Sequence, residues 1–320
     1  MAKSKKYVIG VDLGGTSIKV GVVSKEGKLV KKVFVDTLAS QGPKVVVNQI
    51  KKGIDLVIGD YKKEVGGIGI GSPGVVSMKK GTVENPPNLP GWTKVPLGKL
   101  IEKEFNIRTV VENDANAAAV GELIFGAGKN FSDFVMVTLG TGVGGGIIID
   151  GKLYRGEKGA AGELGHMTID YNGPKCNCGS YGCIETYVGN NYLVERVNKE
   201  LQSGKATKIY DLLDNNLNNL TPKVVFDAAQ LGDEFAKSVI VETGSYLGYA
   251  LTSVINLLDI DKILIGGGVA GFGVLLFDSI RDTIRQRVLK PLAPRIKVLP
   301  AKLKNEAGIK GASALVFYQA

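Results

Sequence analysis

Histidine and cysteine are scarce in this sequence, which has one histidine and three cysteines among 320 residues. The start, MAKSKKY, is followed directly by the apolar and glycine-rich stretch VIGVDLGG, so we expect no cleavable export signal. An odd cysteine count without such a signal argues against a disulfide framework. We therefore expect a cytoplasmic protein.

Long apolar runs and basic stripes are also missing. An apolar stretch without charge, residues 263–277, is too short to span a membrane and is interrupted by glycines. The net charge is +9, but the lysines are scattered rather than gathered with aromatics, so we expect neither a membrane nor a nucleic-acid partner. The positive surplus favours an anionic ligand such as a nucleotide. With 44% apolar residues, the chain can bury a large core, which we expect to be split into two lobes.

The scarce residues gather in one segment, residues 163–185, which reads ELGHMTIDYNGPKCNCGSYGCIE. It contains His166, Cys176, Cys178 and Cys183, and one imidazole with three thiolates completes the shell of a tetrahedral structural zinc. The alternatives are thiols packed as small apolar residues, a disulfide, or an ordinary histidine. Zinc is favoured because the glycines and the proline between the four candidate ligands predict a tight loop that should not bury thiols in an apolar core.

Residues 7–36 alternate apolar strands with tight turns, which predicts a three-stranded antiparallel meander. Its first turn contains Asp12, Gly14, Gly15 and Thr16. The glycines allow backbone N–H groups to approach an anion, and the threonine hydroxyl adds a donor. Taken alone, the turn is equally compatible with a plain glycine hairpin. It is not a Walker A loop, because a strand follows it and no GK[ST] closes it.

The same pattern returns at residue 134, with the strand FVMVTL and a turn containing Gly140, Thr141 and Gly142. Two halves that begin alike indicate an internal duplication, in which two loops face one nucleotide.

Between these meanders we expect helices over residues 43–61, 97–105 and 115–125, the strands GGIGIG and IRTVVEND, and a loop over residues 72–91. Strands followed by helices imply parallel crossovers, with ligands beyond the carboxyl ends of the strands. Asn113 and Asp114 lie at such an end. Two interpretations of Asp114 stay open, a helix N-cap or a general base that accepts a hydroxyl proton.

In the last part of the chain we expect two strands, DKILIG and IKVLPA, and several helices. The helices are expected over residues 185–201, 209–214, 222–229, 233–259, 274–289 and 309–318. Gly266, Gly267 and Gly268 follow the first strand. With Gly271 they match G-x-G-x-x-G, but no acidic strand end follows about twenty residues later, so we expect a surface for adenine and ribose rather than a dinucleotide fold. The predicted lobes are residues 1–115 plus about 303–320, and residues 116–302.

Several motifs occur together in order: VDLGGTSIKVG, GIGSPG, NLPGW, ENDANAAAVGE, LGTGVGGG, GELGH, CxCGxxGCxE and IGGGVAG. Over nearly its whole length the chain resembles the ROK family of sugar kinases and repressors. The resemblance implies a two-lobed α/β fold of the actin-like ATPase (ribonuclease H-like) class. That fold has a duplicated strand-meander core and an active-site cleft between its lobes.

The resemblance also implies an ATP-dependent hexose kinase acting on the 6-hydroxyl of glucose, with Asp114 as catalytic base. Asp12 would hold hydrated Mg²⁺, and His166 would place one ring nitrogen on zinc and the other toward the sugar. The sugar would be bound by Gly71, Asn88, Asn113, Asp114, Glu163, His166 and Glu185. The nucleotide would contact Gly14, Gly15, Thr16, Lys19, Gly140, Thr141, Gly142, Gly266, Gly267 and Gly268. A homodimer or homotetramer is expected.

Other functions remain open at this point. Mannose, fructose, allose and N-acetylmannosamine are alternatives to glucose as the substrate, because kinases for these sugars share the hydroxyl-binding residues. A sugar-sensing regulator is a further alternative. The repressors resemble this chain with a helix-turn-helix module in front, whereas here the first strand is expected near Tyr7, so we expect no DNA-binding module. A non-catalytic sensor would lack the base, but Asp114 is present.

Overall fold

The computed structural model describes residues 5–213 and 216–318. These residues form two compact units. The first consists of residues 5–133, 146–162 and 301–318, and the second of residues 134–145, 163–213 and 216–300. The lobe boundaries expected from the sequence, at residue 115 and near residue 303, stay a prediction.

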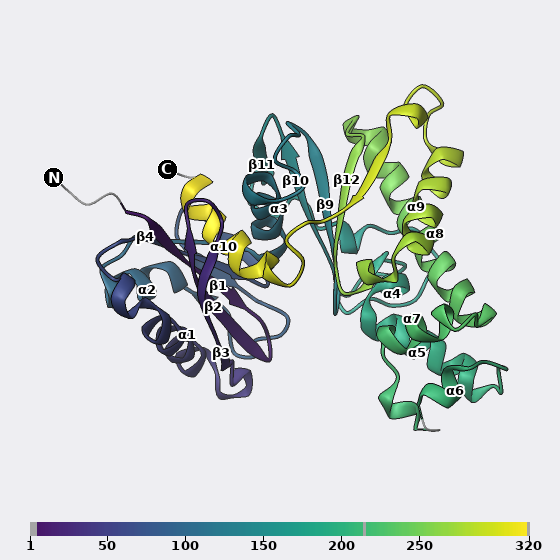
Figure 1. The fold of residues 1–320 in the computed structure, drawn as a ribbon, viewed down its shortest axis with the longest axis horizontal. Coiled ribbons are helices and arrows are strands. Elements are labelled where there is room, and N and C mark those ends of the chain that lie inside the picture. Colours follow the sequence, from purple (N-terminus) through teal and green to yellow (C-terminus); the bar gives the residue numbers. More distant parts are fainter. Residues whose placement is uncertain (1–4, 214–215, 319–320) are drawn as a thin grey trace. The chain divides into compact units, whose positions relative to one another are not determined.

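The first unit is built on a five-stranded sheet with the order β3-β2-β1-β4-β8 (Figure 1). Its strands are β1 Tyr7–Leu13, β2 Ser17–Ser24, β3 Leu29–Asp36, β4 Val65–Ser72 and β8 Thr109–Asn113. The first three pair antiparallel, which confirms the predicted meander, and β4 and β8 are parallel to β1. The helices α1 Pro43–Ile58 and α2 Leu97–Phe105 lie in the crossovers between the parallel strands.

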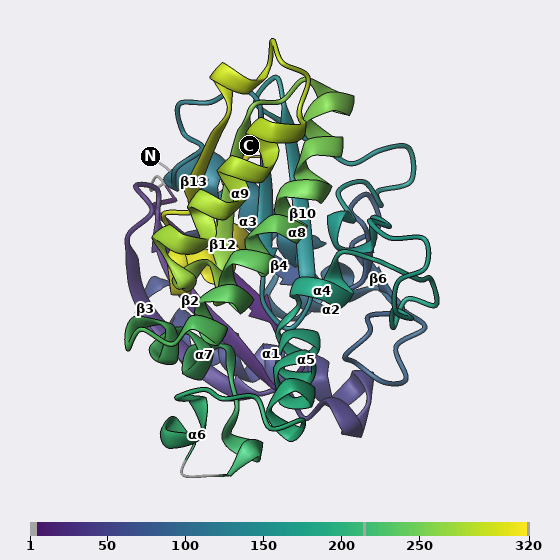
Figure 2. The same cartoon turned by 90° about the vertical axis from the view of Figure 1, so that its right-hand side faces the viewer.

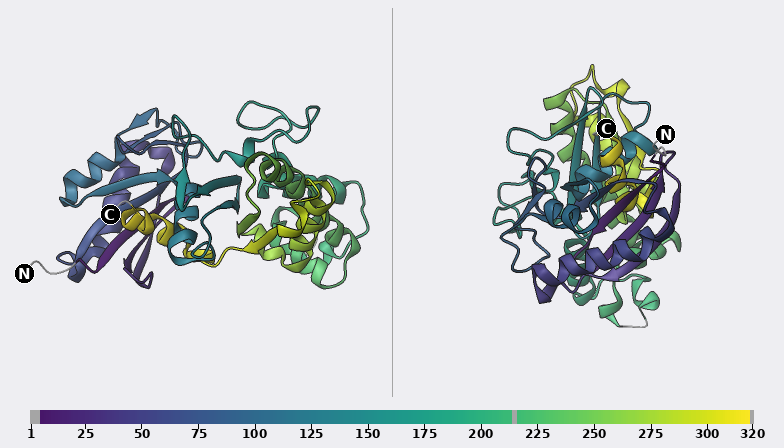
Figure 3. Two further views of the ribbon diagram at one scale, coloured as in Figure 1. Left: turned by 90° about the horizontal axis from the view of Figure 1, so that it is seen from above. Right: turned by 90° about the vertical axis from the view of Figure 1, so that its left-hand side faces the viewer.

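Helices cover both faces of this sheet. In β1, Ile9 and Val11 belong to a core cluster with residues of α1 and α2. Val8 points to the opposite face and packs with Ile309 of α10, Ala307–Tyr318. Because both faces are buried, β1 and β4 are nearly continuous apolar runs, whereas β3 at the edge of the sheet is partly exposed and carries charged residues. Figure 3 shows α10, in yellow, alongside the purple strands of this unit.

Glycines on that second face let α10 approach the sheet closely. A Cβ at Gly10 would lie 2.0 Å from the carbonyl oxygen of Ile309, and one at Gly69 would lie 1.8 Å from that of Ala312. The helix α3, Asp114–Phe125, packs on α10 in the same way, because a Cβ at Gly121 would lie 2.8 Å from the Cα of Gly311. Backbone contact of this kind fixes the register of α3 and α10, and with it the position of the first turn of α3.

A second five-stranded sheet has the order β11-β10-β9-β12-β13. Its strands are β9 Phe134–Leu139, β10 Val143–Ile149, β11 Lys152–Tyr154, β12 Lys262–Gly267 and β13 Lys297–Pro300. The strands β9, β12 and β13 are parallel, as β1, β4 and β8 are in the first sheet. The matching strand order confirms the duplicated core expected from the two strand-and-glycine-turn patterns.

The helices of the second unit include the long α8, Glu234–Leu258, which lies beside α9, Val274–Arg287 (Figure 2). The others are α4 Glu185–Val188, α5 Asn190–Gln202, α6 Ile209–Leu212 and α7 Pro222–Gln230. Short 3₁₀ turns are Ala39–Gln41, Gly59–Tyr61, Leu164–His166, Leu217–Asn219, Val269–Phe272, Ala293–Arg295 and Lys304–Glu306. Among the described residues, no helix is both long enough and apolar enough to cross a bilayer.

Three local expectations are corrected by the structure. The helix expected over residues 185–201 is divided at Gly189, whose extended backbone separates α4 from α5. The expected loop after Ser72 contains two strands, β5 Val75–Ser77 and β6 Thr82–Glu84, because short β-branched runs flank its turns. The strand β6 pairs with β5 on one side and with β7, Lys94–Val95, on the other. The helix expected over residues 209–214 ends at Leu212, and Asp214 lies outside the described residues.

The glycine face of β4 leads to a stability prediction. We expect Gly69→Ala to lower the free energy of unfolding by about 3 kcal/mol, because the new methyl group would collide with the backbone of α10. Gly71→Ala on the same strand is the matched control, since its Cβ would meet nothing closer than the Ala117 side chain at 3.5 Å. Urea denaturation of both variants tests this, and equal stabilities would contradict the close packing.

Candidate functional site

The carboxyl ends of three neighbouring parallel strands bring predicted site residues together in the first unit. Asp12 of β1 pairs in register with Gly71 of β4, and the adjacent Ser72 pairs with Asn113 of β8. A Cβ at Gly71 would lie 3.6 Å from the Cα of Asp114. Ligands collect at this edge of a parallel sheet, so the positions suit a binding site.

The first turn of α3 has an N-cap, and that residue is Asn113 rather than Asp114. The Oδ1 atom of Asn113 accepts hydrogen bonds from the backbone N–H groups of Ala115 at 3.0 Å and Asn116 at 3.2 Å. Asp114 is the first helical residue, is exposed, and its Oδ1 accepts from Ala115 N–H at 2.8 Å. A carboxylate at this end of a helix is stabilised by the helix dipole. Asp114 is therefore an exposed carboxylate at the carboxyl ends of the parallel strands, and it accepts a hydrogen bond from the neighbouring backbone N–H of Ala115.

The turn after β1 places Lys19 on Asp12, with Nζ 3.0 Å from Oδ2. The Gly14 carbonyl accepts a hydrogen bond of 2.7 Å from the Thr37 hydroxyl, which braces the turn. A Cβ at Gly15 would lie 2.9 Å from the Cβ of Asn88, so the absence of a side chain lets the predicted sugar residue approach the turn. Thr16 is exposed. The same oxygen of Asp12 also lies against the start of α10, where a Cβ at Gly308 would lie 2.1 Å from Oδ2.

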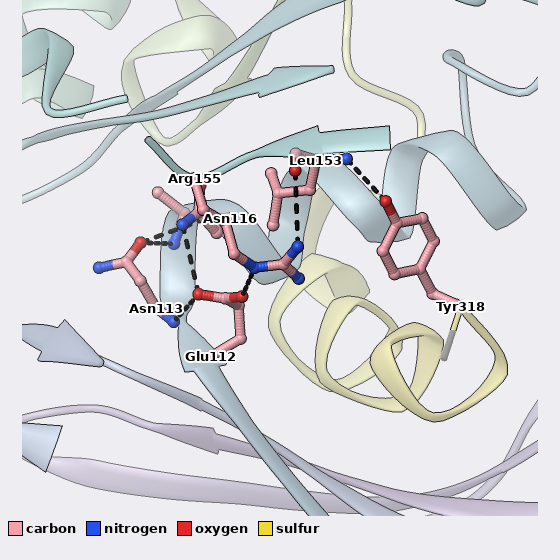
Figure 4. Close-up of polar contacts among 7 residues, drawn as sticks. Glu112, Asn113, Asn116, Leu153, Arg155 and Tyr318 are labelled. Carbon is pink, nitrogen blue, oxygen red and sulfur yellow. Dashed lines mark hydrogen bonds and ion pairs between the residues drawn. The ribbon is translucent and has the colours of Figure 1, made fainter. Parts of the chain in front are cut away.

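At the start of α3 lies a buried ion pair, between Glu112 and Arg155, to which the sequence analysis assigned no role. Glu112 is 1% exposed, and its Oε2 accepts a hydrogen bond of 2.7 Å from Nε of Arg155 (Figure 4). A charged residue inside the apolar strand VVEN was the available signal, because carboxylates are rarely buried without a partner.

In the second unit, the structure brings the single imidazole and the three thiols together. The ligand atoms of His166, Cys176, Cys178 and Cys183 all lie within 4.8 Å of one another. Nδ1 of His166 is 3.8 Å from Sγ of Cys176, and the Sγ atoms of Cys178 and Cys183 are 3.7 Å apart. Ligand bonds of about 2.0–2.3 Å to a tetrahedral zinc separate neighbouring ligand atoms by about 3.5–3.8 Å. The donor set and its spacing therefore fit zinc.

Burial makes two of the thiols poor acids in the absence of a cation. Cys176 and Cys183 are buried, contrary to the expectation that this glycine-rich loop would keep thiols out of the interior. Burial raises the pKa of Cys176 and raises that of Cys183 to about 12. The backbone N–H of Ser180 lowers the pKa of Cys178, which is exposed. Coordination by a divalent cation would favour the thiolate form of all three.

The cysteine loop is held in shape by close backbone packing and by a tyrosine. Gly182 has φ +63, and a Cβ there would lie 1.7 Å from the carbonyl oxygen of Asp170. The Tyr187 hydroxyl donates to Oδ2 of Asp170 at 3.0 Å, and burial together with this bond raises the pKa of Tyr187 to about 12. Tyr192 accepts from the backbone N–H of Asn177 at 3.3 Å. The loop is thus bonded to α4 and α5 through residues other than the four metal-ligand candidates.

Glu185, predicted from the resemblance to bind sugar, also contacts the glycine turn after β9. Its Oε2 accepts a hydrogen bond of 2.9 Å from the backbone N–H of Val143, and a Cβ at Gly142 would lie 2.3 Å from the same oxygen. Its Oε1 lies 4.0 Å from Sγ of Cys176. One carboxylate therefore joins the cysteine loop to the predicted phosphate turn. The side chains of Glu163 and Thr141, two further predicted site residues, are exposed.

The third glycine motif lies beside this turn within the second unit. Gly266 and Gly267 pair in register with Thr138 and Leu139 of β9, directly before Gly140. Gly267 has φ +90, and a Cβ there would lie 2.1 Å from the Leu139 carbonyl oxygen. The structure thus brings Gly140–Gly142 and Gly266–Gly268 to one edge of the second sheet.

The metal site leads to a prediction on composition and pH. We expect purified protein to contain about one zinc per chain, and Cys178→Ser to lower this content strongly. Asn177→Ser, in the same loop, is the control, because Asn177 offers Tyr192 only its backbone. Zinc uptake should release protons, since buried thiols with raised pKa values are protonated without the metal, so affinity should fall as pH falls. Metal analysis that finds no zinc in the unmodified protein would reject the site.

A second prediction concerns Glu185. Replacing it with alanine removes the acceptor of the Val143 N–H, so we expect amide exchange over residues 140–143 to accelerate by about tenfold or more. Glu195→Ala on the exposed side of α5 serves as the control, because Glu195 pairs only with Lys199 among the described residues. Hydrogen-exchange mass spectrometry measures both variants, and an unchanged turn in Glu185→Ala would show that this carboxylate does not hold it.

Comparison with known proteins identifies the family. The family model described as "ROK family" matches residues 8–318. The chain is 36% identical to a glucokinase of Thermotoga maritima over 98% of both chains. It is 31% identical to a xylose repressor of Caldicellulosiruptor bescii, over 97% of this chain and 77% of the repressor. It resembles the crystal structure of a ROK family glucokinase from Streptomyces griseus in complex with glucose and AMPPNP, with a TM-score of 0.86 and 36% identity, covering 97% and 98% of the two chains. These likenesses confirm the expected two-lobed, actin-like α/β fold, and the chain belongs to the ROK family.

Proposed function

We propose that this protein is an ATP-dependent hexose kinase that phosphorylates the 6-hydroxyl of glucose. The observation that carries the proposal is the placement of Asp114, an exposed carboxylate on the first residue of α3 at the carboxyl edge of a parallel sheet. Support for the sugar and the nucleotide comes from relatives. Glucokinases are 36% identical over nearly the whole chain, and one similar structure holds glucose and AMPPNP.

Asp114 would act as the general base. It would accept the proton of the sugar hydroxyl while that oxygen attacks the terminal phosphorus of ATP and the bond to the leaving ADP oxygen breaks. Little covalent chemistry falls to the protein in phosphoryl transfer, so alignment and charge neutralisation supply most of the rate. The capping bonds of Asn113 and the close packing of α3 on α10 would provide that alignment.

The nucleotide would be bound by the glycine turns. We assign Gly14, Gly15 and Thr16 in the first unit, and Gly140, Thr141 and Gly142 in the second, to the phosphates, because backbone N–H groups in glycine turns bind anions. Asp12 would hold hydrated Mg²⁺, which neutralises phosphate charge when bound, and Lys19 would balance Asp12. Gly266, Gly267 and Gly268 would face the adenine and ribose.

The sugar would be held by hydroxyl-binding side chains and small residues. We assign this role to Gly71, Asn88, Asn113 and Asp114 in the first unit, and to Glu163, His166 and Glu185 in the second. Zinc would bind Nδ1 of His166 and thereby set the direction of the opposite ring nitrogen. A site built from fixed polar groups discriminates against sugars that lack a matching hydroxyl. The same residues would serve mannose, fructose, allose or N-acetylmannosamine, so glucose is proposed from the relatives.

A sugar-responsive regulator is the second candidate. It is supported by the 31% identity to the xylose repressor, of which this chain covers 77%. The exposed Asp114 favours the kinase, because a sensor has no use for a base at that position.

The kinase proposal predicts saturable ADP release with MgATP and glucose. Asp114→Asn should lower kcat by about 10²–10⁴-fold, because the base is lost while the shape is kept. Asp55→Asn, which makes the same change at an exposed carboxylate of α1, is the matched control and should retain full turnover. A coupled assay with glucose, mannose, fructose, allose and N-acetylmannosamine ranks the substrates by kcat/KM. Sugar binding without turnover for every sugar would overturn the kinase in favour of the regulator.

A further inference from the structure

Arg155 lies one residue beyond β11 and forms the ion pair with Glu112, the residue two positions before Asp114. We propose that Arg155 is a positioning residue that sets the place of Asp114 through Glu112. The proposal rests on the proposed role of Asp114 as base, and it adds a residue that makes no contact with substrate. Figure 4 shows Glu112 between Arg155 and the start of α3.

The carboxylate of Glu112 bonds to both sides of the turn that carries Asp114. Its Oε1 accepts from the backbone N–H of Asn113 at 3.0 Å and from Nδ2 of Asn116 at 3.3 Å. Its Oε2 accepts from Nε of Arg155 at 2.7 Å. Asn113 also caps α3, so a single carboxylate orients the cap residue and the next turn of the helix. Any movement of Glu112 would be passed directly to Asn113 and Asp114.

Glu112 stays in place only while its charge is compensated. Its side chain is 2% exposed, against 22% for Arg155. Arg155 is the only basic side chain that pairs with Glu112 among the described residues. Removing one partner of a buried pair leaves an uncompensated charge, which the structure must neutralise or expose to water. Loss of Arg155 would therefore displace Glu112 and, with it, the first turn of α3, to which Glu112 is hydrogen-bonded.

Arg155 is itself held by the backbone around it. The N–H of Leu153 donates to the Tyr318 hydroxyl of α10 at 2.7 Å. The carbonyl of Arg155 accepts from the N–H of Ala161 at 3.1 Å, which closes a short loop, and Glu163 follows two residues later. Arg155 therefore bonds through its side chain to Glu112, before the turn that bears Asp114, and through its carbonyl to Ala161, two residues before Glu163.

The test compares Arg155→Met, which removes the charge at similar length, with Arg155→Lys and with the double variant Glu112→Gln/Arg155→Met. Lysine keeps the charge without the Nε–H geometry, and the double variant leaves no buried charge. Lys152→Met, at an exposed position of β11, is the control. For each variant, kcat and the KM for MgATP are measured with the preferred sugar, and amide exchange is followed over residues 113–116.

We expect Arg155→Met to lower kcat by about 10- to 100-fold, because a small misplacement of the base is costly. The KM for MgATP should stay within about twofold, because the nucleotide contacts are unchanged. Exchange over residues 113–116 should accelerate, and Arg155→Lys and the double variant should recover part of both losses. A purely structural ion pair would lower thermal stability but leave kcat and this local exchange unchanged in the folded protein.

Wild-type kcat and exchange in folded Arg155→Met would overturn the proposal. If that variant does not fold, Arg155→Lys and the double variant decide, and wild-type values in both would overturn it equally. The exchange measurement separates this inference from the kinase proposal. A wild-type protein that turns over no sugar would contradict the kinase proposal. Faster amide exchange at residues 113–116 in the Arg155 variants would still support the role of Arg155 in positioning Asp114.

Discussion

The close approach of α10 to the glycine-lined face of the first sheet is the constraint on which the candidate site depends. Gly10 and Gly69 leave space that the backbone of α10 fills, and Gly121 and Gly311 bring α3 onto the same helix. Close-packed interiors transmit small displacements instead of absorbing them. The carboxyl ends of β1, β4 and β8 and the first turn of α3 are consequently held in one rigid frame, at which Asp12 and Asp114 are placed.

Carboxylates that accept backbone N–H groups recur at the joints of this fold. Glu112 bonds to the start of α3, and Glu185 bonds to the glycine turn after β9. Glu122, which is fully buried, accepts from Ala127 at 2.6 Å, Lys302 at 3.1 Å and Leu303 at 2.8 Å. It thereby ties α3 to the segment where the chain re-enters the first unit after Pro300. Hydrogen bonds to ionised groups are roughly twice as strong as neutral ones, which suits them to fixing irregular backbone.

The cysteine loop combines a metal-ligand set with independent support. Burial raises the pKa values of two of the thiols, so a cation must displace their protons to bind, while the bonds of Tyr187 and Tyr192 hold the loop against α4 and α5. Since Glu185 lies 4.0 Å from Cys176 and also bonds to Val143, the order of this loop and of the glycine turn is coupled within one unit. A zinc ion held by these four ligands would act through the shape of the loop, because a complete Cys3His set leaves no open position for chemistry at the metal.

The sequence by itself determined the strand meanders, the parallel crossovers, the metal-ligand set and the place of Asp114 at the start of a helix. These features depend on local signals, namely alternation, glycine turns, a capping residue and close ligand spacing. Only the tertiary structure decided which distant residues meet. Glu112 and Arg155 are 43 positions apart, Val143 and Glu185 are 42 apart, and Glu122 and Leu303 are 181 apart. No local pattern encodes such partners, because they are selected by the packing of whole elements, and that packing brings buried charges and backbone donors within reach of one another.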